Sequence, residues 1–392
     1  MPESLFIVGG EVEPPYFVGR RNEIEKMKMD IRTLAQNNVI IGPRRIGKTS
    51  LLKNLKLSVQ GEFLFVTVNC REMTGFSDFF RAVTQALLAA YEEKHHVKGL
   101  AQRYSQIFRG KITAAYKSLS EVGGSIEHVG NIYLRFREKD VDEEELVFET
   151  FDFIRKFSGE KKEPIIIAFD EFQELKRFNG RIFNTLKSQM DSQPSVRYIF
   201  SGSSVSLLHE VFLKPDSPLY LMAARIQLEP IEEEHVRKYI RDRLLTRNIE
   251  ITERALKKIY EYTGGFPFYF QKIGFILYQN SVLKNKNIID EEDVKSAFNS
   301  MLGEFDSEFE ARYEWKFSHQ QKIILKFLSK EEYRRLSEIS SDMQTPASSL
   351  TTSMKDLYNT MTIAKPEEGL YGILDNVFRI WIQRNILRTF GE

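Results

Sequence analysis

The stretch "NNVIIGPRRIGKTS", residues 37–50, decides how the rest of the chain is interpreted. An apolar run ends at Gly42, and Gly47, Lys48 and Thr49 follow at the spacing Gly-x-x-x-x-Gly-Lys-Thr, just before the helical pattern "LLKNL". The glycines let the backbone curl so that its N–H groups point inward, and a helix N-terminus adds the positive end of its dipole. The spacing therefore predicts a phosphate-binding loop between a buried strand and a helix. Lys48 would lie on the β- and γ-phosphates of a nucleotide, and the Thr49 hydroxyl on Mg²⁺.

A second stretch, "PIIIAFDEFQEL" (residues 164–175), places Asp170 and Glu171 directly after an apolar strand pattern. An aspartate at a strand end can complete the oxygen shell of Mg²⁺, and an adjacent glutamate can orient and deprotonate a water molecule. Taken alone, such a pair is more typical of a solvated strand end. Together with the phosphate-binding loop it predicts a nucleotide site with Lys48, Asp170 and Glu171 as catalytic residues and Thr49 and Asp170 as metal ligands.

The missing guanine-specific motif indicates which nucleotide base the site binds. The guanine-specific pattern Asn/Thr-Lys-x-Asp does not occur in the chain, which favours ATP and ADP as cofactors. One strand pattern, "EFLFVTVNC" (62–70), lies between the two motifs in the sequence. The intervening chain is therefore long enough for an extra strand between the two motif strands in the sheet.

Composition excludes several classes of protein. The 392 residues carry a formal net charge of +1, so overall charge gives no argument for nucleic acid, a membrane surface or an acidic substrate. The single cysteine, Cys70, excludes an intrachain disulfide and a multi-thiolate zinc site. No stretch approaches the roughly 18–20 apolar residues that span a bilayer, and the first residues do not have the pattern of a secretory signal. A cytoplasmic protein is expected.

The patterning divides the chain into three expected domains. Residues 1–230 alternate short β-rich runs with helical patterns, which predicts a mostly parallel sheet covered on both faces. Within this core, residues 93–140 form a less legible insert that resembles helix followed by a hairpin. Residues 231–305 are helical throughout, with a Gly pair suited to a C-cap at Gly264 and a cap at Asp290. Residues 312–392 hold three short helical patterns followed by an extended stretch and a closing helix.

At this point the motifs resemble a known family. The segments that carry the resemblance occur in one order along the chain: "YFVGRRNEIEKM", "GPRRIGKTSLL", "IIIAFDEFQEL", "YIFSGSSVSLL", "LYLMAARIQLEPI" and "YTGGFPFYFQKI". This is the order of the archaeal-type AAA+/STAND P-loop ATPases, which are relatives of origin-recognition AAA+ proteins and of signalling NTPases. The resemblance covers about residues 15–300. It implies an α/β fold with an AAA+-like parallel sheet core, a helical lid and a C-terminal winged helix.

The resemblance also implies roles for individual residues. The box around Val18, Gly19 and Arg20 would lie on the adenine side, although its local sequence fits a helix-entry turn equally well. Ser203 would sense the γ-phosphate or the attacking water, with Ser201 as second choice. Arg225 would reach the γ-phosphate of its own or a neighbouring subunit, which leaves a nucleotide-dependent homo-oligomer open; a surface arginine is an equal alternative.

The helical lid departs from the usual AAA+ pattern. No arginine occurs between Arg254 and Arg312, so the expected sensor arginine of the lid is missing. The turn containing Pro267 is instead similar to the STAND pattern, in which the proline packs on nucleotide. A switch controlled by ADP and ATP is therefore favoured over a processive motor. The role of Arg44 and Arg45 stays open, since both can face phosphate or pair with carboxylates elsewhere. The residues expected to bind nucleotide are Val18, Gly19, Arg20, Gly42, Pro43, Arg44, Arg45, Ile46, Gly47, Lys48, Thr49, Ser50 and Pro267.

The charge of the C-terminal domain bears on which function the chain performs. In its recognition-like segment, "TPASSLTTSMKDLYNT", only Lys355 is basic, and the domain is nearly neutral. Salt-dependent DNA affinity needs several Lys or Arg on phosphates. The first hypothesis is an ATPase switch with an unidentified protein partner, and the alternative is an initiator-like ATPase that places its winged helix on double-stranded DNA. A structural adaptor with negligible turnover is a third.

Overall fold

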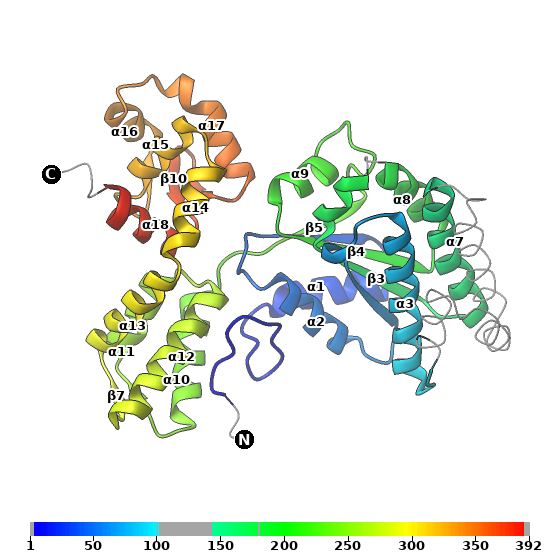
Figure 1. Ribbon diagram of the computed structural model, residues 1–392, viewed down its shortest axis with the longest axis horizontal. Coiled ribbons are helices and arrows are strands. Elements are labelled where there is room, and N and C mark those ends of the chain that lie inside the picture. The colour runs from blue at the N-terminus through cyan, green and yellow to red at the C-terminus, as the bar shows by residue number, and fades with distance from the viewer. Residues whose placement is uncertain (1–3, 100, 102–142, 179–180, 388–392) are drawn as a thin grey trace. The chain divides into compact units, whose positions relative to one another are not determined.

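The computed structural model of the chain describes residues 4–99, 101, 143–178 and 181–387 (Figure 1). Most of the insert expected at residues 93–140 lies outside these ranges. The chain forms two compact units: the sheet unit, residues 21–41 and 51–227, and the helical unit, residues 1–20, 42–50 and 228–392. The phosphate-binding loop and the N-terminal box thus belong to the helical unit, although the loop continues covalently from a strand of the sheet unit.

The sheet unit is built on five parallel strands in the order β2-β3-β4-β1-β5. Their bounds are β1 Asn37–Ile41, β2 Leu64–Asn69, β3 Ile165–Asp170, β4 Val196–Gly202 and β5 Ala223–Gln227. The predicted parallel sheet is confirmed, and so is an extra strand between the two motif strands β1 and β3. That strand is β4, however, and the strand pattern that lies between the motifs in the sequence, β2, is at the sheet edge beyond β3.

Helices cover both faces of this sheet. They are α1 Arg21–Arg32, α2 Lys48–Ser58, α3 Phe76–His95, α7 Glu143–Lys161, α8 Arg181–Ser192 and α9 Val205–Leu213. Crossovers between parallel strands are right-handed, so the chain from β1 out to β2 and the chain returning through β3 and β4 place their helices on opposite faces. Figure 1 shows α1 and α2 on one side of the strands and α3, α7 and α8 on the other. All six residues of β3 are buried, as a central strand requires.

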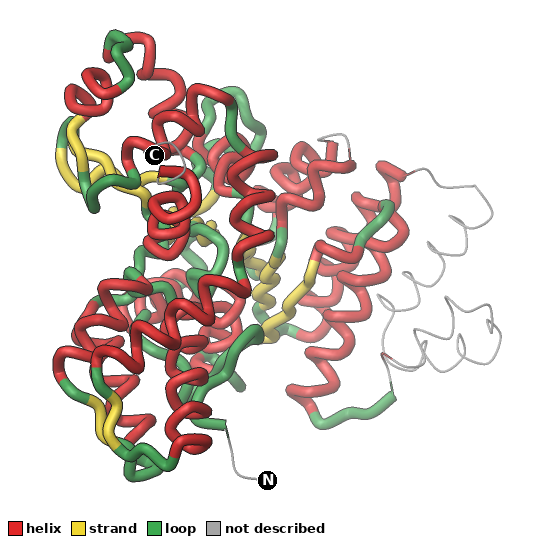
Figure 2. Tube along the Cα trace, turned by 60° about the vertical axis from the view of Figure 1, so that its left-hand side comes forward, coloured by secondary structure: helices red, strands yellow, loops and turns green. Residues whose placement is uncertain are grey.

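The helical unit begins its main part with four helices that pack against one another (Figure 2). They are α10 Glu233–Leu245, α11 Glu253–Thr263, α12 Pro267–Lys284 and α13 Glu291–Glu304, with a two-stranded pair of β6 Glu250–Ile251 and β7 Ile288–Ile289. The expected C-cap is confirmed, because α11 ends on Gly264 at φ 55°. The expected N-cap at Asp290 is confirmed too, and its side chain forms a capping box with Asp293.

The remaining helices and strands of this unit follow as α14 Asp306–Lys316, α15 His319–Leu328, β8 Arg334–Arg335, α16 Leu336–Asp342, α17 Ala347–Asn359, β9 Ile363–Glu367, β10 Leu370–Ile373 and α18 Asn376–Ile382. A turn of π-helix, Gln383–Leu387, extends α18. The three strands pair antiparallel in the order β8-β10-β9. We call residues 318–387 the C-terminal module. Among the described residues, each helix is too short or too polar to cross a membrane.

Candidate functional site

The loop after β1 has the backbone shape that the sequence spacing predicts. Gly47 adopts φ 93°, a left-handed conformation that favours glycine, and α2 begins at the next residue. A Cβ on Gly42 would lie 2.8 Å from Cγ2 of Ile46, so that position has no room for a side chain. The loop is therefore tightly curled at the N-terminus of an 11-residue helix, where backbone N–H groups and the helix dipole favour an anion.

Three side chains follow this turn. Lys48 is buried, and its Nζ donates to the carbonyl oxygens of Gly42 and Pro43, both at 2.9 Å. Its charge is thus held over the loop itself. Thr49 lies in the first turn of α2, and the Ser50 hydroxyl accepts a hydrogen bond of 3.2 Å from the Val12 backbone N–H.

The N-terminal box and the lid turn both lie against this loop within the helical unit. Arg20 is buried and donates from Nη2 to the carbonyl oxygen of Ile46 at 3.2 Å. Gly19 and Arg20 adopt φ values of 66° and 67°, which turn the chain sharply after Val18. A Cβ on Gly47 would lie 3.8 Å from Cγ of Pro267. The structure thus brings together three of the sequence-predicted elements: the box, the loop and the proline.

The predicted carboxylates lie at the carboxyl edge of the sheet. Asp170 is the last residue of β3, is buried, and accepts a 3.0 Å hydrogen bond from the backbone N–H of Glu171. Ile41 pairs with Gly202, the last residue of β4, which in turn neighbours β3. Because parallel strands end on one side, β1 and β3 end at the same edge of the sheet.

Glu171 belongs to a polar cluster with Gln173 and Ser203. The Ser203 hydroxyl donates to Oε2 of Glu171 at 3.0 Å, and Nε2 of Gln173 donates both to the same carboxylate and to Oγ of Ser203, the latter at 3.1 Å. The Ser203 backbone N–H donates to Oε1 of Gln173 at 3.2 Å. The side-chain amide thus joins the ends of two strands. Gln173 was not predicted from the sequence, where its only signal is its place two residues after Glu171.

The cluster depends on a close approach at Gly202. A Cβ there would lie 2.2 Å from Oε1 of Gln173. Gly202→Ala is therefore expected to displace the amide from Ser203. The lost hydrogen bonds should lower the free energy of unfolding by about 0.5–1.5 kcal/mol, seen as a lower midpoint of thermal unfolding. Gly159→Ala in α7 is the matched control, because nothing lies within 4 Å of its added Cβ. It should raise stability by about 0.5–1 kcal/mol. Equal midpoints for Gly202→Ala and wild type would contradict this packing.

Two other predicted residues, Ser201 and Arg225, have no recorded hydrogen bond to this cluster among the described residues. The Ser201 side chain is wholly buried, and its hydroxyl has no hydrogen-bond partner among the described residues. Arg225 lies in β5 opposite Val39, is exposed, and donates a hydrogen bond to Gln227 of the same strand. Ser203, the first choice from the sequence, is thus the serine that reaches Glu171.

The donors available to a metal suit Mg²⁺. Within the ranges that the structure describes, no three His, Cys, Asp or Glu side chains gather as a metal cage. Mg²⁺ does not need one, since it is usually held by one or two protein oxygens together with phosphate and water. Buried Asp170 and the Thr49 hydroxyl are oxygen donors of this kind. Cys70, which follows β2, is no candidate, because burial and the nearby carboxylates raise its pKa and keep the thiol protonated.

The two loop arginines differ in their surroundings. Arg44 is exposed, whereas Nη1 of Arg45 donates to the Tyr269 hydroxyl of α12 at 2.9 Å. Arg45 adopts φ 70°. Of the two alternatives that the sequence left open for Arg45, the structure has its guanidinium paired with lid groups.

Comparisons with known proteins agree with this geometry. A family model described as an ATPase domain predominantly from Archaea matches residues 17–273. A Walker-type ATPase of Pyrococcus abyssi superposes with a TM-score of 0.70 at 18% identity, covering 97% of this chain and 99% of that one. The ORC2 protein of Aeropyrum pernix, in its ADPNP–ADP complexes, gives a TM-score of 0.56 at 13% identity, covering 98% of each chain. No curated protein matches the chain. At these identities the structural likenesses show the fold alone.

Proposed function

The chain belongs to the family of ATPase domains that come predominantly from Archaea, and from this premise we propose that it binds Mg²⁺–ATP and hydrolyses it slowly to ADP and phosphate. One observation carries the proposal. Strand β1, which leads into the phosphate-binding loop, and strand β3, which ends in Asp170, end at the same edge of one parallel sheet with β4 between them. Phosphoryl transfer needs a phosphate cradle together with carboxylates, and the chain continues from these two strand ends into both motifs.

Each residue has a role in this proposal. The curled backbone from Gly42 to Gly47 and the Lys48 ammonium bind the β- and γ-phosphates, and Lys48 exchanges its loop carbonyls for phosphate oxygens. Thr49 and Asp170 would hold Mg²⁺, which when bound neutralises charge on the phosphates. Glu171 accepts a proton from the water whose oxygen attacks the γ-phosphorus, as the bond from that phosphorus to the β–γ bridging oxygen breaks and ADP leaves.

The polar cluster supports the assignment of Glu171 as the base. Its carboxylate is oriented by the Ser203 hydroxyl and the Gln173 amide, which both donate to Oε2. Fixed hydrogen bonds of this kind reduce the reorganisation needed during the reaction. Val18, Gly19, Arg20 and Pro267 would contact the adenosine part of the nucleotide, because Arg20 and Pro267 both lie against the loop.

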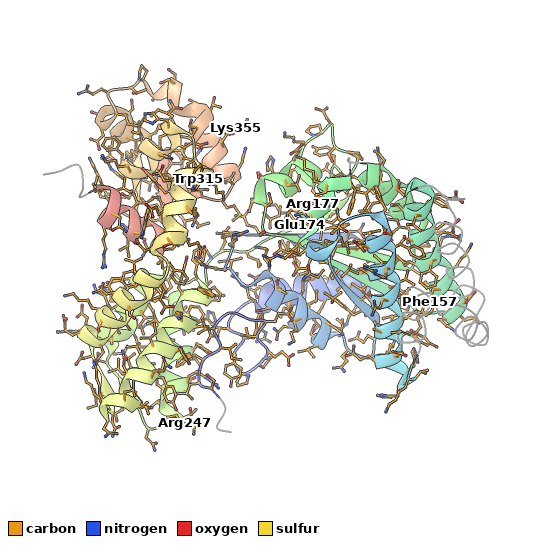
Figure 3. All side chains as sticks on the ribbon, viewed as in Figure 1. Phe157, Glu174, Arg177, Arg247, Trp315 and Lys355 are labelled. Atoms are coloured by element: carbon orange, nitrogen blue, oxygen red, sulfur yellow. The ribbon has the colours of Figure 1, made fainter. Side chains whose placement is uncertain are left out.

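The finer proposal is a switch in which ATP and ADP change the state of the C-terminal module. We assign this module as a winged helix from the order of its elements: helix α15, strand β8, helices α16 and α17, and the hairpin β9–β10. Lys355 is the only basic residue of α17 (Figure 3). The tip of the hairpin carries Glu367 and Glu368. Few cations and an acidic tip favour a protein partner over the phosphate backbone of DNA.

The experiment that tests this choice is ATP hydrolysis at low salt with and without double-stranded DNA, with Glu171→Gln as the blank. We expect slow phosphate release that DNA leaves unchanged. Stimulation by DNA that disappears as salt rises would overturn the protein-partner proposal and favour the initiator-like alternative. Release equal to that of the blank would overturn the ATPase proposal itself.

A further inference from the structure

We infer that Arg45 is a positioning residue through which nucleotide in the phosphate-binding loop controls α14 and the C-terminal module. The inference rests on the proposed nucleotide binding and adds to it the route by which the loop and the module are connected. All the residues involved belong to the helical unit.

The first observation is where the Arg45 side chain lies. Its guanidinium carbon is 4.9 Å from the ring centre of Phe268, 4.5 Å from that of Phe305 and 5.9 Å from that of Phe309. Nη1 donates to the Tyr269 hydroxyl at 2.9 Å, and Nη2 pairs with Glu308 at 2.5 Å. These partners come from α12, from the residue between α13 and α14, and from α14. A residue of the phosphate-binding loop is thus enclosed by aromatic rings of the lid and of α14.

The backbone conformation at Arg45 would suit glycine, which indicates that the position holds arginine because of its side chain. A φ of 70° is costly for any residue with a Cβ and costs glycine nothing. Burial alone would lower the pKa of Arg45, but the Tyr269 oxygen, Glu308 and Asp375 outweigh it and raise the pKa. The guanidinium therefore remains a cation inside its aromatic enclosure, held by opposite charge and by the ring faces.

The second observation is that Tyr269 passes the connection on to the C-terminal module. Its side chain is wholly buried, and its hydroxyl donates to Oδ2 of Asp375 at 3.1 Å while it accepts from Arg45. Burial raises the pKa of this hydroxyl well above its usual value, so it remains a donor. Asp375 caps α18 through the Phe378 backbone N–H at 3.1 Å. It also accepts from Nη1 of Arg312 of α14 at 2.8 Å.

These contacts form one continuous polar path from the loop through α12 to the starts of α14 and α18. The buried Tyr269 hydroxyl accepts from Arg45 on one side and donates to Asp375 on the other, so displacing either residue costs it a hydrogen bond. Such a network changes between discrete arrangements rather than by degrees. Phosphate binding draws the loop N–H groups and Lys48 inward, and Arg45, two residues before Gly47, has to follow. Its partners in the lid and the C-terminal module then have to change position or oppose the movement of the loop. Nucleotide binding in the loop and the position of the module are therefore coupled in both directions.

The chain carries its own reporter for the far end of this path. Its two tryptophans are Trp315 on α14, which is 88% exposed (Figure 3), and Trp381 on α18, which is 2% exposed. Nε1 of Trp381 donates to Oδ1 of Asp306, the first residue of α14, at 2.7 Å. In the Trp315→Phe chain, tryptophan emission therefore comes from Trp381 alone. It reports on the surroundings of that ring, which include Phe309 and Tyr313 of α14 and Phe378 of α18.

The experiment adds Mg²⁺–ATP to the Trp315→Phe chain and follows Trp381 emission, while calorimetry measures ATP binding separately. Tyr269→Phe removes one hydroxyl from the path, and Arg45→Gly removes the side chain at a backbone angle that glycine tolerates. Tyr239→Phe is the matched control, since it removes a hydroxyl that donates to Gln271 of α12 at 2.9 Å and takes no part in the path. We expect ATP to change Trp381 emission in the Trp315→Phe chain and in the Tyr239→Phe control. With Tyr269→Phe or Arg45→Gly present, ATP should still bind and the emission change should be lost.

Three outcomes would overturn the inference. Emission could change in both path variants as it does in the control, or stay constant in the Trp315→Phe chain although calorimetry shows that ATP binds. If calorimetry shows no binding even in the wild-type chain, the proposed function fails together with the inference, which distinguishes that outcome from the other two. Should Arg45→Gly not fold, Tyr269→Phe decides the question alone.

Discussion

Glu171→Gln is expected to slow ATP hydrolysis by about 10²- to 10⁴-fold while ATP still binds with nearly wild-type affinity. The replacement keeps the size of the side chain, and its amide oxygen can still accept from Ser203. An amide cannot, however, take a proton from the attacking water. Turnover is measured as phosphate release, and affinity by calorimetry on the same preparation.

Glu174→Gln is the matched control for this prediction. Glu174 lies three residues further along, in the 3₁₀ segment Phe172–Phe178, and pairs there with Arg177 (Figure 3). It takes no part in the cluster with Ser203. Its replacement should leave turnover close to that of wild type. If both glutamines slowed hydrolysis equally, general disturbance of the strand end would explain the effect and Glu171 would lose its role as base.

Lys48→Ala is expected to weaken ATP binding by about 10- to 100-fold, which is the range for losing hydrogen bonds to a charged group. In the structure its Nζ donates to the Gly42 and Pro43 carbonyls at the helix N-terminus, so its charge lies on the loop that would hold the phosphates. The loss should be much smaller for AMP than for ATP, because the proposed contacts are to the β- and γ-phosphates. Calorimetry with the two nucleotides measures this difference.

Lys56→Ala is the control for the loss of a cation of α2 in general. It removes a positive charge from the last turn of the helix that Lys48 begins, where Lys56 pairs with Glu93 at 2.7 Å. Its affinity for ATP should remain near that of wild type. Equal loss for ATP and AMP in Lys48→Ala would contradict the assignment of Lys48 to the outer phosphates and point to a collapsed loop instead.

The parts that the sequence predicted are those with short-range causes. The phosphate-binding loop follows from glycine spacing, and its left-handed turn at Gly47 is a property of that residue alone. The parallel sheet follows from apolar runs that alternate with helical patterns, because both faces of such a sheet are buried. The caps at Gly264 and Asp290 follow from residue types at helix ends.

The parts that the sequence did not predict depend on pairings between distant segments. Nothing near Val196–Gly202 indicates that β4 lies between β1 and β3, since strand order is set by how the whole sheet is assembled. Gln173 meets Ser203 only because β3 and β4 are neighbours in this order. The sequence around Arg45 does not predict its contacts either, because its aromatic enclosure comes from residues more than two hundred positions away along the chain.

ATP hydrolysis at this site is tested most directly by the fate of ATP during a single turnover. Trace ATP is mixed with excess protein and Mg²⁺, and the fraction converted to ADP is followed for wild type and Glu171→Gln side by side. We predict that wild type converts its bound ATP to ADP, whereas the variant retains bound ATP unchanged. Intact ATP on both proteins would contradict the assignment of the chain as a hydrolysing switch, and equal conversion by both would contradict the role of Glu171.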